Sequence, residues 1–202
     1  MNEKLSIKSL FNKYGYDNPI FLSEFNDDNA RMRQYLLRKS KEGKIRKYDR
    51  GIYYFPSTTI LGESELSPIE ICISKYIGTK ENKGYISGLG FEYNLGISTQ
   101  VPNIIEITTN ATSSKRRIVT IGKQKVILKK PYTVINADNC KALQILDFIN
   151  SCNTNKLLKS KQCIKLYIQD NDLSQKMIRY LNVYPSTIYK KLIEGEIYVF
   201  TS

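Results

Sequence analysis

Apolar residues at helical spacing predict three helices in the first part of the chain. Residues 3–14 have near-helical apolar spacing and stop at Gly15, which predicts a first helix. Residues 19–25 predict a short second helix, because a proline at its first position suits a helix start. The Asn-Asp-Asp run at 26–28 supplies a turn and an N-cap for a third helix.

The third helix is the strongest of these predictions. Met32, Tyr35 and Leu36 fall at i, i+3 and i+4, so they share one face that would be buried. Gly43 follows and suits the left-handed conformation that ends a helix.

Two short β-prone runs after this helix predict a hairpin. They cover residues 45–48 and 52–55, and Asp49-Arg50-Gly51 between them is turn-forming. A basic helix followed by a basic hairpin is the plan of a winged helix-turn-helix. In that plan the helix enters a major groove and the hairpin lies along the phosphates. We therefore predict a DNA-binding domain over residues 1–57, followed by a polar linker over residues 62–67.

A second folded region is predicted from residue 66 to residue 202. Ser67, Pro68 and Glu70 form a capping box that starts a helix running to about Ile77. Strands are predicted at 104–109, 117–121 and 125–128, the last two as a hairpin, and helices at 138–149, 156–169, 173–181 and 186–193. The fold class is therefore α+β, with a winged helix followed by a mixed α/β domain that has a small antiparallel sheet and C-terminal helices.

The glycine-rich stretch 84–102 invites comparison with phosphate-binding loops. It contains neither G-x-x-x-x-G-K-[ST] nor G-x-G-x-x-G after a strand. We instead expect a short helix or tight turns over residues 89–95.

The amino-acid composition excludes several kinds of catalytic site. The chain has no histidine, which excludes Ser-His-Asp and Cys-His catalysis, and its four cysteines are widely spaced, so we expect no metal site and no cofactor. Cys72 and Cys163 lie in apolar runs and are predicted core residues. No run of 18 apolar residues and no signal peptide are visible, so we expect a cytoplasmic protein. Fifteen tyrosines would suit base stacking, but apolar surroundings predict core positions for Tyr53, Tyr54, Tyr85 and Tyr93.

Positive charge is concentrated in two stretches. Residues 31–50 and residues 111–130 each carry a net +7, against +12 for the whole chain, which leaves −2 for all other residues. Positive charge concentrated in this way predicts a polyanionic partner. Nucleic acid is the first candidate and an anionic membrane is the second. Neither stretch has the bulky apolar face that a membrane-surface helix needs, so we expect no membrane binding.

Three segments resemble a known family: residues 42–56 (EGKIRKYDRGIYYFP), 84–103 (GYISGLGFEYNLGISTQVPN) and 105–122 (IEITTNATSSKRRIVTIG). Together they resemble the AbiEi-type antitoxins and related transcriptional regulators of abortive-infection, type IV toxin–antitoxin systems. The resemblance spans roughly residues 5–150. It implies a repressor that binds inverted repeats in its own promoter. It also implies an antitoxin that counters a nucleotidyltransferase-like toxin without forming a stable complex, and it carries over no catalytic residue.

The candidate DNA contacts come from the basic helix and the hairpin. Arginine and glutamine side chains can pair with guanine and adenine edges, which makes four helix residues candidates for base contacts: Arg31, Arg33, Gln34 and Arg38. Five further cations would touch phosphates or a minor groove: Lys41, Lys44, Arg46, Lys47 and Arg50.

The second basic stretch has several interpretations. Its candidate residues are Lys115, Arg116, Arg117, Lys123 and Lys125. They would extend the DNA footprint, contact RNA, or only discourage pairing at a sheet edge.

Two other functions remain compatible with the sequence. One is a winged-helix regulator with a sensing domain and no antitoxin role. The other is a defence-system nuclease built on Glu106 and Asp138. Glu106 stands alone in its strand, without the second acid and the lysine that a nuclease strand carries, so we interpret it as an exposed strand residue. We expect no enzyme activity.

Overall fold

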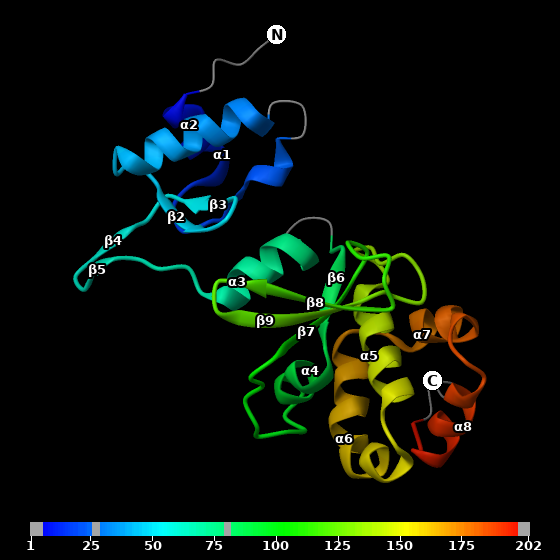
Figure 1. Cartoon of the computed structure of the whole chain (residues 1–202). Coiled ribbons are helices and arrows are strands. Elements are labelled where there is room, and N and C mark those ends of the chain that lie inside the picture. The colour runs from blue at the N-terminus through cyan, green and yellow to red at the C-terminus, as the bar shows by residue number, and fades with distance from the viewer. Residues whose placement is uncertain (1–5, 26–28, 79–81, 198–202) are drawn as a thin grey trace. The chain divides into compact units, whose positions relative to one another are not determined.

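The computed structural model describes residues 6–25, 29–78 and 82–197, and the predicted N-cap at 26–28 lies outside them. The architecture is mixed α/β. The chain divides into two compact units, whose helices and strands are labelled in Figure 1. Unit 1 comprises Met1–Lys75 with Ile121–Lys123, and unit 2 comprises Tyr76–Thr120 with Gln124–Ser202.

Unit 1 combines two helices with a three-stranded sheet. The helices are α1 (Ile7–Tyr14) and α2 (Asn29–Lys41), and a 3₁₀ turn, η1 (Leu22–Glu24), lies between them. The strands are β1 (Ile20–Phe21), β2 (Arg46–Asp49) and β3 (Ile52–Tyr54). Their order is β1-β3-β2, and both pairs are antiparallel.

The predicted second helix at 19–25 is wrong for most of its length. Ile20 and Phe21 instead form β1 and pair with Tyr53 and Ile52 of β3. Both are buried, Ile20 completely. The apolar pair is stabilised by the partner strand, which outweighs the local helix-start signal of the preceding proline.

The core of unit 1 explains why its helices form. Met32 and Leu36 of α2 are 2% and 0% exposed, which confirms the predicted buried face. Leu10 of α1 joins the same core, and Phe11 packs edge-on against Phe55 with ring centroids 5.2 Å apart. The helix α1 starts in a capping box, in which the side chains of Ser6 and Ser9 accept hydrogen bonds from each other's backbone N–H groups.

Beyond the first sheet, unit 1 contains a second, smaller hairpin, whose second strand begins the segment 62–67 that was predicted to be a linker. It comprises β4 (Thr58–Thr59) and β5 (Gly62–Glu63). The residues at its tip, Ile60 and Leu61, are 103% and 95% exposed. The helix α3 (Pro68–Cys72) follows and continues into the π-helical segment η3 (Ile73–Ile77), with the predicted capping box of Ser67 and Glu70 in place.

Unit 2 is built on a four-stranded sheet with the order β6-β7-β9-β8. Its strands are β6 (Gly84–Ser87), β7 (Ile105–Thr109), β8 (Arg116–Ile121) and β9 (Gln124–Lys129). The predicted strands are present, and the pair β6–β7 is antiparallel. The pair β7–β9 is parallel, a feature that the sequence analysis did not anticipate. The strand β8 lies at the sheet edge.

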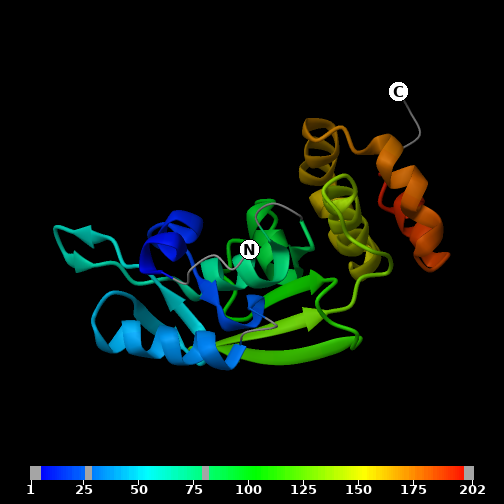
Figure 2. The same ribbon diagram turned by 90° about the horizontal axis from the view of Figure 1, so that it is seen from above.

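Helices complete unit 2. The short helix α4 (Gly88–Asn94) follows β6 and confirms the expectation for the glycine-rich stretch. The C-terminal helices are α5 (Cys140–Ser151), α6 (Thr154–Asp170), α7 (Ser174–Tyr180) and α8 (Thr187–Glu194), with a 3₁₀ turn, η4 (Leu181–Val183), before the last. They form a group to one side of the sheet, as Figures 1 and 2 show, and α5 is the most buried of them.

The core predictions for individual residues have mixed outcomes. Cys72 is buried, as predicted, whereas Cys163 is half-buried. Tyr53, Tyr54 and Tyr85 are buried, but Tyr93 is 46% exposed, so its predicted core position is wrong. No helix in the described part of the chain is long and apolar enough to cross a membrane.

Candidate nucleic-acid interface

All nine predicted DNA contacts are exposed on unit 1. Five lie on α2, with Arg38 and Lys41 in its last turn, and the others lie on the loop and hairpin that follow. The structure therefore brings the predicted residues together on two consecutive elements.

The exposed face of α2 has a centre and two flanks. At about 100° per residue, Gln34 lies near the middle of this face, and Arg31 and Arg33 lie on opposite flanks roughly 160° apart. Arg31, Gln34 and Arg38 line a hollow of about 440 Å³ on one flank, together with Tyr35.

The other flank faces the hairpin. Arg33 and Leu37 of α2 line a second hollow, of about 460 Å³, together with Lys47 and Arg50 of the hairpin segment. Leu37 is 37% exposed, and the sequence analysis did not single it out. In the sequence, the indication for Leu37 was that it is apolar but does not lie on the helix face that carries Met32 and Leu36.

The hairpin is anchored by its inner strand, β3. Ile52 and Tyr53 of β3 are buried, and Lys47 lies opposite Tyr53 in the register. The carboxylate of Asp49 accepts a hydrogen bond of 2.6 Å from the backbone N–H of Arg50, which shapes the turn. Gly51 completes the turn at φ 75°, a conformation that favours glycine.

Three of the nine candidates have carboxylate partners at the surface. Glu42 lies 3.8 Å from Arg38 and 3.7 Å from Lys44, and Glu63 lies 2.5 Å from Arg46. These are exposed pairs, which contribute little to stability and exchange readily for other anions. Glu42 also accepts a 2.6 Å hydrogen bond from Lys39, which is the largest cause of its lowered pKa.

Four other candidates lack a salt-bridge partner in the described part of the chain, although Lys47 contributes to the lowered pKa of Asp49. Within the ranges that the structure describes, the following residues form no salt bridge: Arg33, Lys41, Lys47 and Arg50. They span the helix and the hairpin, so this surface presents a continuous run of available cations.

The residues of the second predicted patch are divided between the two units. Its five residues, Lys115, Arg116, Arg117, Lys123 and Lys125, are exposed. Lys115 and Arg116 line a pocket in unit 2, whereas Lys123 belongs to the turn that is grouped with unit 1. Because β8 is an edge strand, the arginines at its start also suit protection of that edge.

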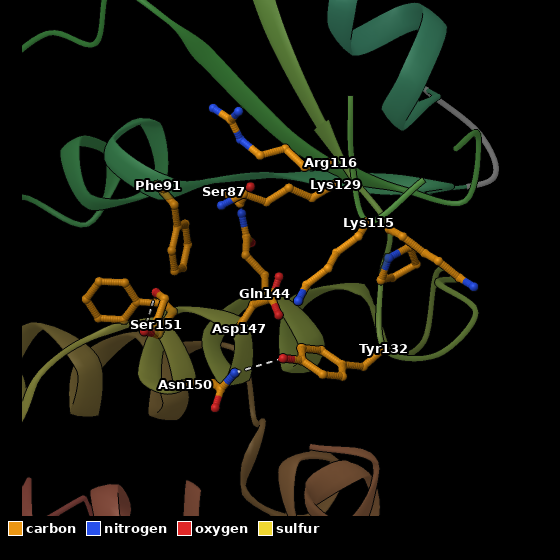
Figure 3. Close-up of a pocket in the computed structure, with 14 residues that line it drawn as sticks. Ser87, Phe91, Lys115, Arg116, Lys129, Tyr132, Gln144, Asp147, Asn150 and Ser151 are labelled. Carbon is orange, nitrogen blue, oxygen red and sulfur yellow. Dashed lines mark hydrogen bonds between the residues drawn. The ribbon is translucent and has the colours of Figure 1, made fainter. Parts of the chain in front are cut away.

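The sequence analysis missed this pocket, which encloses about 810 Å³ (Figure 3). Its least expected residue is Asp147 of α5, a carboxylate between the buried residues Leu146 and Phe148. A lone acid inside an apolar helical stripe was the signal that could have identified it. Burial raises the pKa of Asp147, while the hydrogen bonds from Tyr85 and Thr108 act in the opposite direction.

The two acids of the nuclease hypothesis have separate partners. Glu106 lies 2.5 Å from Lys129, and Asp138 lies 2.7 Å from Lys176. Glu106 is half-buried, so its predicted exposed position is wrong. Among the residues that the structure describes, no group of three or more Cys, Asp or Glu side chains could hold a metal ion.

Comparison with protein families assigns the chain to a family. A model of a family of unknown function, DUF6088, matches residues 16–175. The chain belongs to this family. No curated protein matched the chain in a sequence comparison. The matched region includes α2, the β2–β3 hairpin and the whole sheet of unit 2, so members of DUF6088 are defined by parts of both units.

Proposed function

We propose that unit 1 is a winged helix-turn-helix domain that binds double-stranded DNA. The observation that carries the proposal is the run of exposed cations over α2 and the β2–β3 hairpin. The stretch 31–50 has a net charge of +7, and four of its cations have no salt bridge among the described residues. A solvated surface without a polyanionic partner would mix both signs.

The helix α2 would read bases from the major groove. Gln34, at the centre of the exposed face, would pair with an adenine edge, and Arg31 and Arg38 would reach guanines beside it. Leu37 would contact a thymine methyl group, because it is the apolar residue on the same exposed face.

The hairpin would hold the phosphate backbone. Lys47 and Arg50 lie across a hollow from Arg33, so one strand of phosphates running through that hollow would meet all three cations. Such contacts position the protein on DNA and carry no base information. Arg33, on the hairpin side, would therefore serve both the groove and the backbone.

The decisive test is binding of the full chain to a duplex from its own promoter and to a random duplex, over a series of salt concentrations. We expect tighter binding to the promoter, and affinity for both that falls with a log–log slope of roughly −0.9 per neutralised phosphate. A triple variant, Arg33→Ala with Lys47→Ala and Arg50→Ala, should lose most binding to both duplexes.

The matched control removes the same charge elsewhere. Lys141→Ala with Lys159→Ala and Lys190→Ala changes three exposed lysines of unit 2 and should bind as the unaltered protein does. If both triple variants lose the same affinity, net charge alone explains the binding. If the unaltered chain ignores both duplexes at low salt, the proposal fails.

We further propose that the protein represses its own promoter and acts as an antitoxin, without a catalytic step and without a stable complex with the toxin. The support is the sequence resemblance over residues 84–103 and 105–122, which lies in unit 2. Expression of a nucleotidyltransferase-like toxin together with a chain lacking residues 1–57 tests this role. We expect at least partial rescue of growth. A regulator that only senses a ligand would give no rescue with either the full or the shortened chain.

A further inference from the structure

The pocket of unit 2 has three chemically different walls. The start of β8 and the end of β9 supply cations, α5 supplies Asp147 and amide side chains, and aromatic rings close the remaining side. Figure 3 shows Lys115 extending from the strand side toward α5, which carries Gln144 and Asp147. The volume of about 810 Å³ is in the range of small-molecule sites.

The cationic wall carries positively charged side chains that could bind an anion. Lys115, Arg116, Lys129 and Lys130 line it. Lys129 is paired with Glu106 at 2.5 Å. In the described part of the chain, Lys115, Arg116 and Lys130 form no salt bridge. These three cations give the pocket positive charge for an anionic group such as a phosphate, and Lys115 is the one whose side chain extends toward α5 (Figure 3).

The aromatic wall consists of rings at two places, with Phe91 at one end of the pocket and Tyr132 at the other (Figure 3). Phe91 and Phe148 are buried and pack edge-on with centroids 5.9 Å apart. Tyr132 is 50% exposed and packs against Tyr184 at 4.5 Å on one side, which fixes its ring. A half-exposed, fixed ring at a pocket wall suits stacking with a planar ligand group.

Asp147 adds an acceptor inside the pocket. The hydrogen bonds from Tyr85 and from Thr108 both end on its Oδ2 atom, at 3.0 and 3.2 Å. Gln144 has both of its polar atoms engaged, by the carbonyl of Ile86 and the hydroxyl of Tyr167. Asp147 is therefore the group best placed to accept from a neutral donor on a ligand, such as a sugar hydroxyl.

We propose that this pocket binds a mononucleotide, with the phosphate at Lys115, Arg116 and Lys130, the base against Tyr132, and a sugar hydroxyl at Asp147. A simple phosphate would leave the aromatic wall and the carboxylate unused. An uncharged aromatic ligand would leave the three cations unused. The site is separate from the surface of α2 and the hairpin, so it goes beyond DNA binding.

The test is calorimetric titration of the full chain with each of the four ribonucleoside monophosphates, with adenosine, and with inorganic phosphate. We expect at least one monophosphate to bind saturably with one site and a dissociation constant below about 1 mM. Adenosine and phosphate should each bind at least about tenfold more weakly, because each lacks one half of the contacts.

Substitutions of single pocket residues test which side chains contact the monophosphate. Lys115→Ala and Lys130→Ala should each weaken monophosphate binding about tenfold, as should Tyr132→Leu, which keeps an apolar side chain but removes the ring. Lys159→Ala, an exposed lysine of α6 outside the pocket, should leave binding unchanged. Asp147→Asn should weaken monophosphate binding and strengthen phosphate binding, since it removes the negative charge and replaces one of the two acceptor oxygens with an NH₂ group that only donates.

Clear outcomes overturn the proposal. It fails if no monophosphate saturates, if inorganic phosphate binds as tightly as any monophosphate, or if only an RNA oligonucleotide binds. It also fails if the pocket variants, shown to be folded by unchanged melting temperature, bind as the unaltered chain does. The DNA-binding triple variant of unit 1 should bind the monophosphate normally, so the two proposals succeed or fail separately.

Discussion

The hydroxyl of Tyr85 on β6 donates a 3.0 Å hydrogen bond to the carboxylate of Asp147 on α5. Thr108 of β7 donates a second bond to the same oxygen at 3.2 Å. Tyr85 is 3% exposed and Thr108 is 1% exposed, so this small network joins the sheet of unit 2 to its central helix inside the core. It links residues that are 62 and 39 positions apart in the sequence.

Tyr85→Phe should destabilise unit 2 by about 1–3 kcal/mol, because the buried carboxylate loses a donor. Urea denaturation measures this change as a lower free energy of unfolding. Tyr93→Phe is the matched control: Tyr93 is 46% exposed, and removal of its hydroxyl should change stability by less than about 0.5 kcal/mol. Equal effects of the two substitutions would show that the hydrogen bond to Asp147 does not stabilise the fold.

The raised pKa of Asp147 predicts a pH dependence of stability. Burial raises this pKa above its ordinary value of 3.8, so the folded state binds the proton more tightly than the unfolded state. The contribution of Asp147 to the free energy of unfolding is therefore greatest below pH 3.8. It falls as the pH rises through the folded-state pKa.

The variant Asp147→Asn isolates this contribution, because it cannot ionise. Urea denaturation of both proteins at acidic and at neutral pH should show the unaltered chain losing stability relative to the variant as the pH rises. A difference that stays constant, or that moves in the opposite direction, would show that Asp147 is not held in a proton-favouring environment.

Neighbouring leucines of α2 should respond very differently to truncation. Leu36 is 0% exposed, and Leu36→Ala should cost about 2–5 kcal/mol through lost burial and the cavity left behind. Leu37 is 37% exposed, so Leu37→Ala should cost less than about 1 kcal/mol while weakening binding to promoter DNA. Thermal unfolding and DNA titration of both variants separate the roles, and a reversed order would mean that α2 is rotated about its axis.

Base contacts and phosphate contacts should be distinguishable on the proposed DNA surface. Gln34→Ala should reduce discrimination at one base pair by about 1–3 kcal/mol and leave binding to random DNA nearly unchanged. Lys47→Ala should weaken binding to promoter and random duplexes alike and reduce the salt slope by about 1. Fluorescence anisotropy with both duplexes measures these effects, and identical behaviour of the two variants would contradict the assigned roles.

The exposed tip of the β4–β5 hairpin should be dispensable for folding. Ile60 and Leu61 are 103% and 95% exposed, so they bury no apolar surface in the folded chain. The double variant Ile60→Ser with Leu61→Ser should therefore keep its melting temperature within a few degrees, at a cost below about 0.5 kcal/mol. A clear drop in calorimetric melting temperature would reveal a packing partner for this tip.

Local patterns predicted the elements that stabilise themselves over a few residues. The buried face of α2, the turn around Gly51 and the capping box of Ser67 depend on neighbours within one or two turns of chain. The prediction of a helix over 19–25 is wrong because this segment depends on distant residues. Ile20 and Phe21 form a strand by pairing with β3, which lies more than thirty positions away in the sequence.

The two candidate sites also differ in whether their residues are close together in the sequence. The basic surface of unit 1 was predictable, because its cations lie on two consecutive elements with a regular period. The pocket of unit 2 was not, because Ser87, Lys115, Tyr132 and Asp147 come from separate segments that meet only when the sheet and α5 pack.

The sequence by itself determined the helical and strand periods, the caps and the two concentrations of positive charge, since these follow from side chains close together along the chain. Only the tertiary structure decided the parallel pairing of β7 with β9 and the hydrogen bond that joins Asp147 to Tyr85. Contacts of that kind depend on the path that the chain takes between distant residues, and no local pattern of side chains specifies that path.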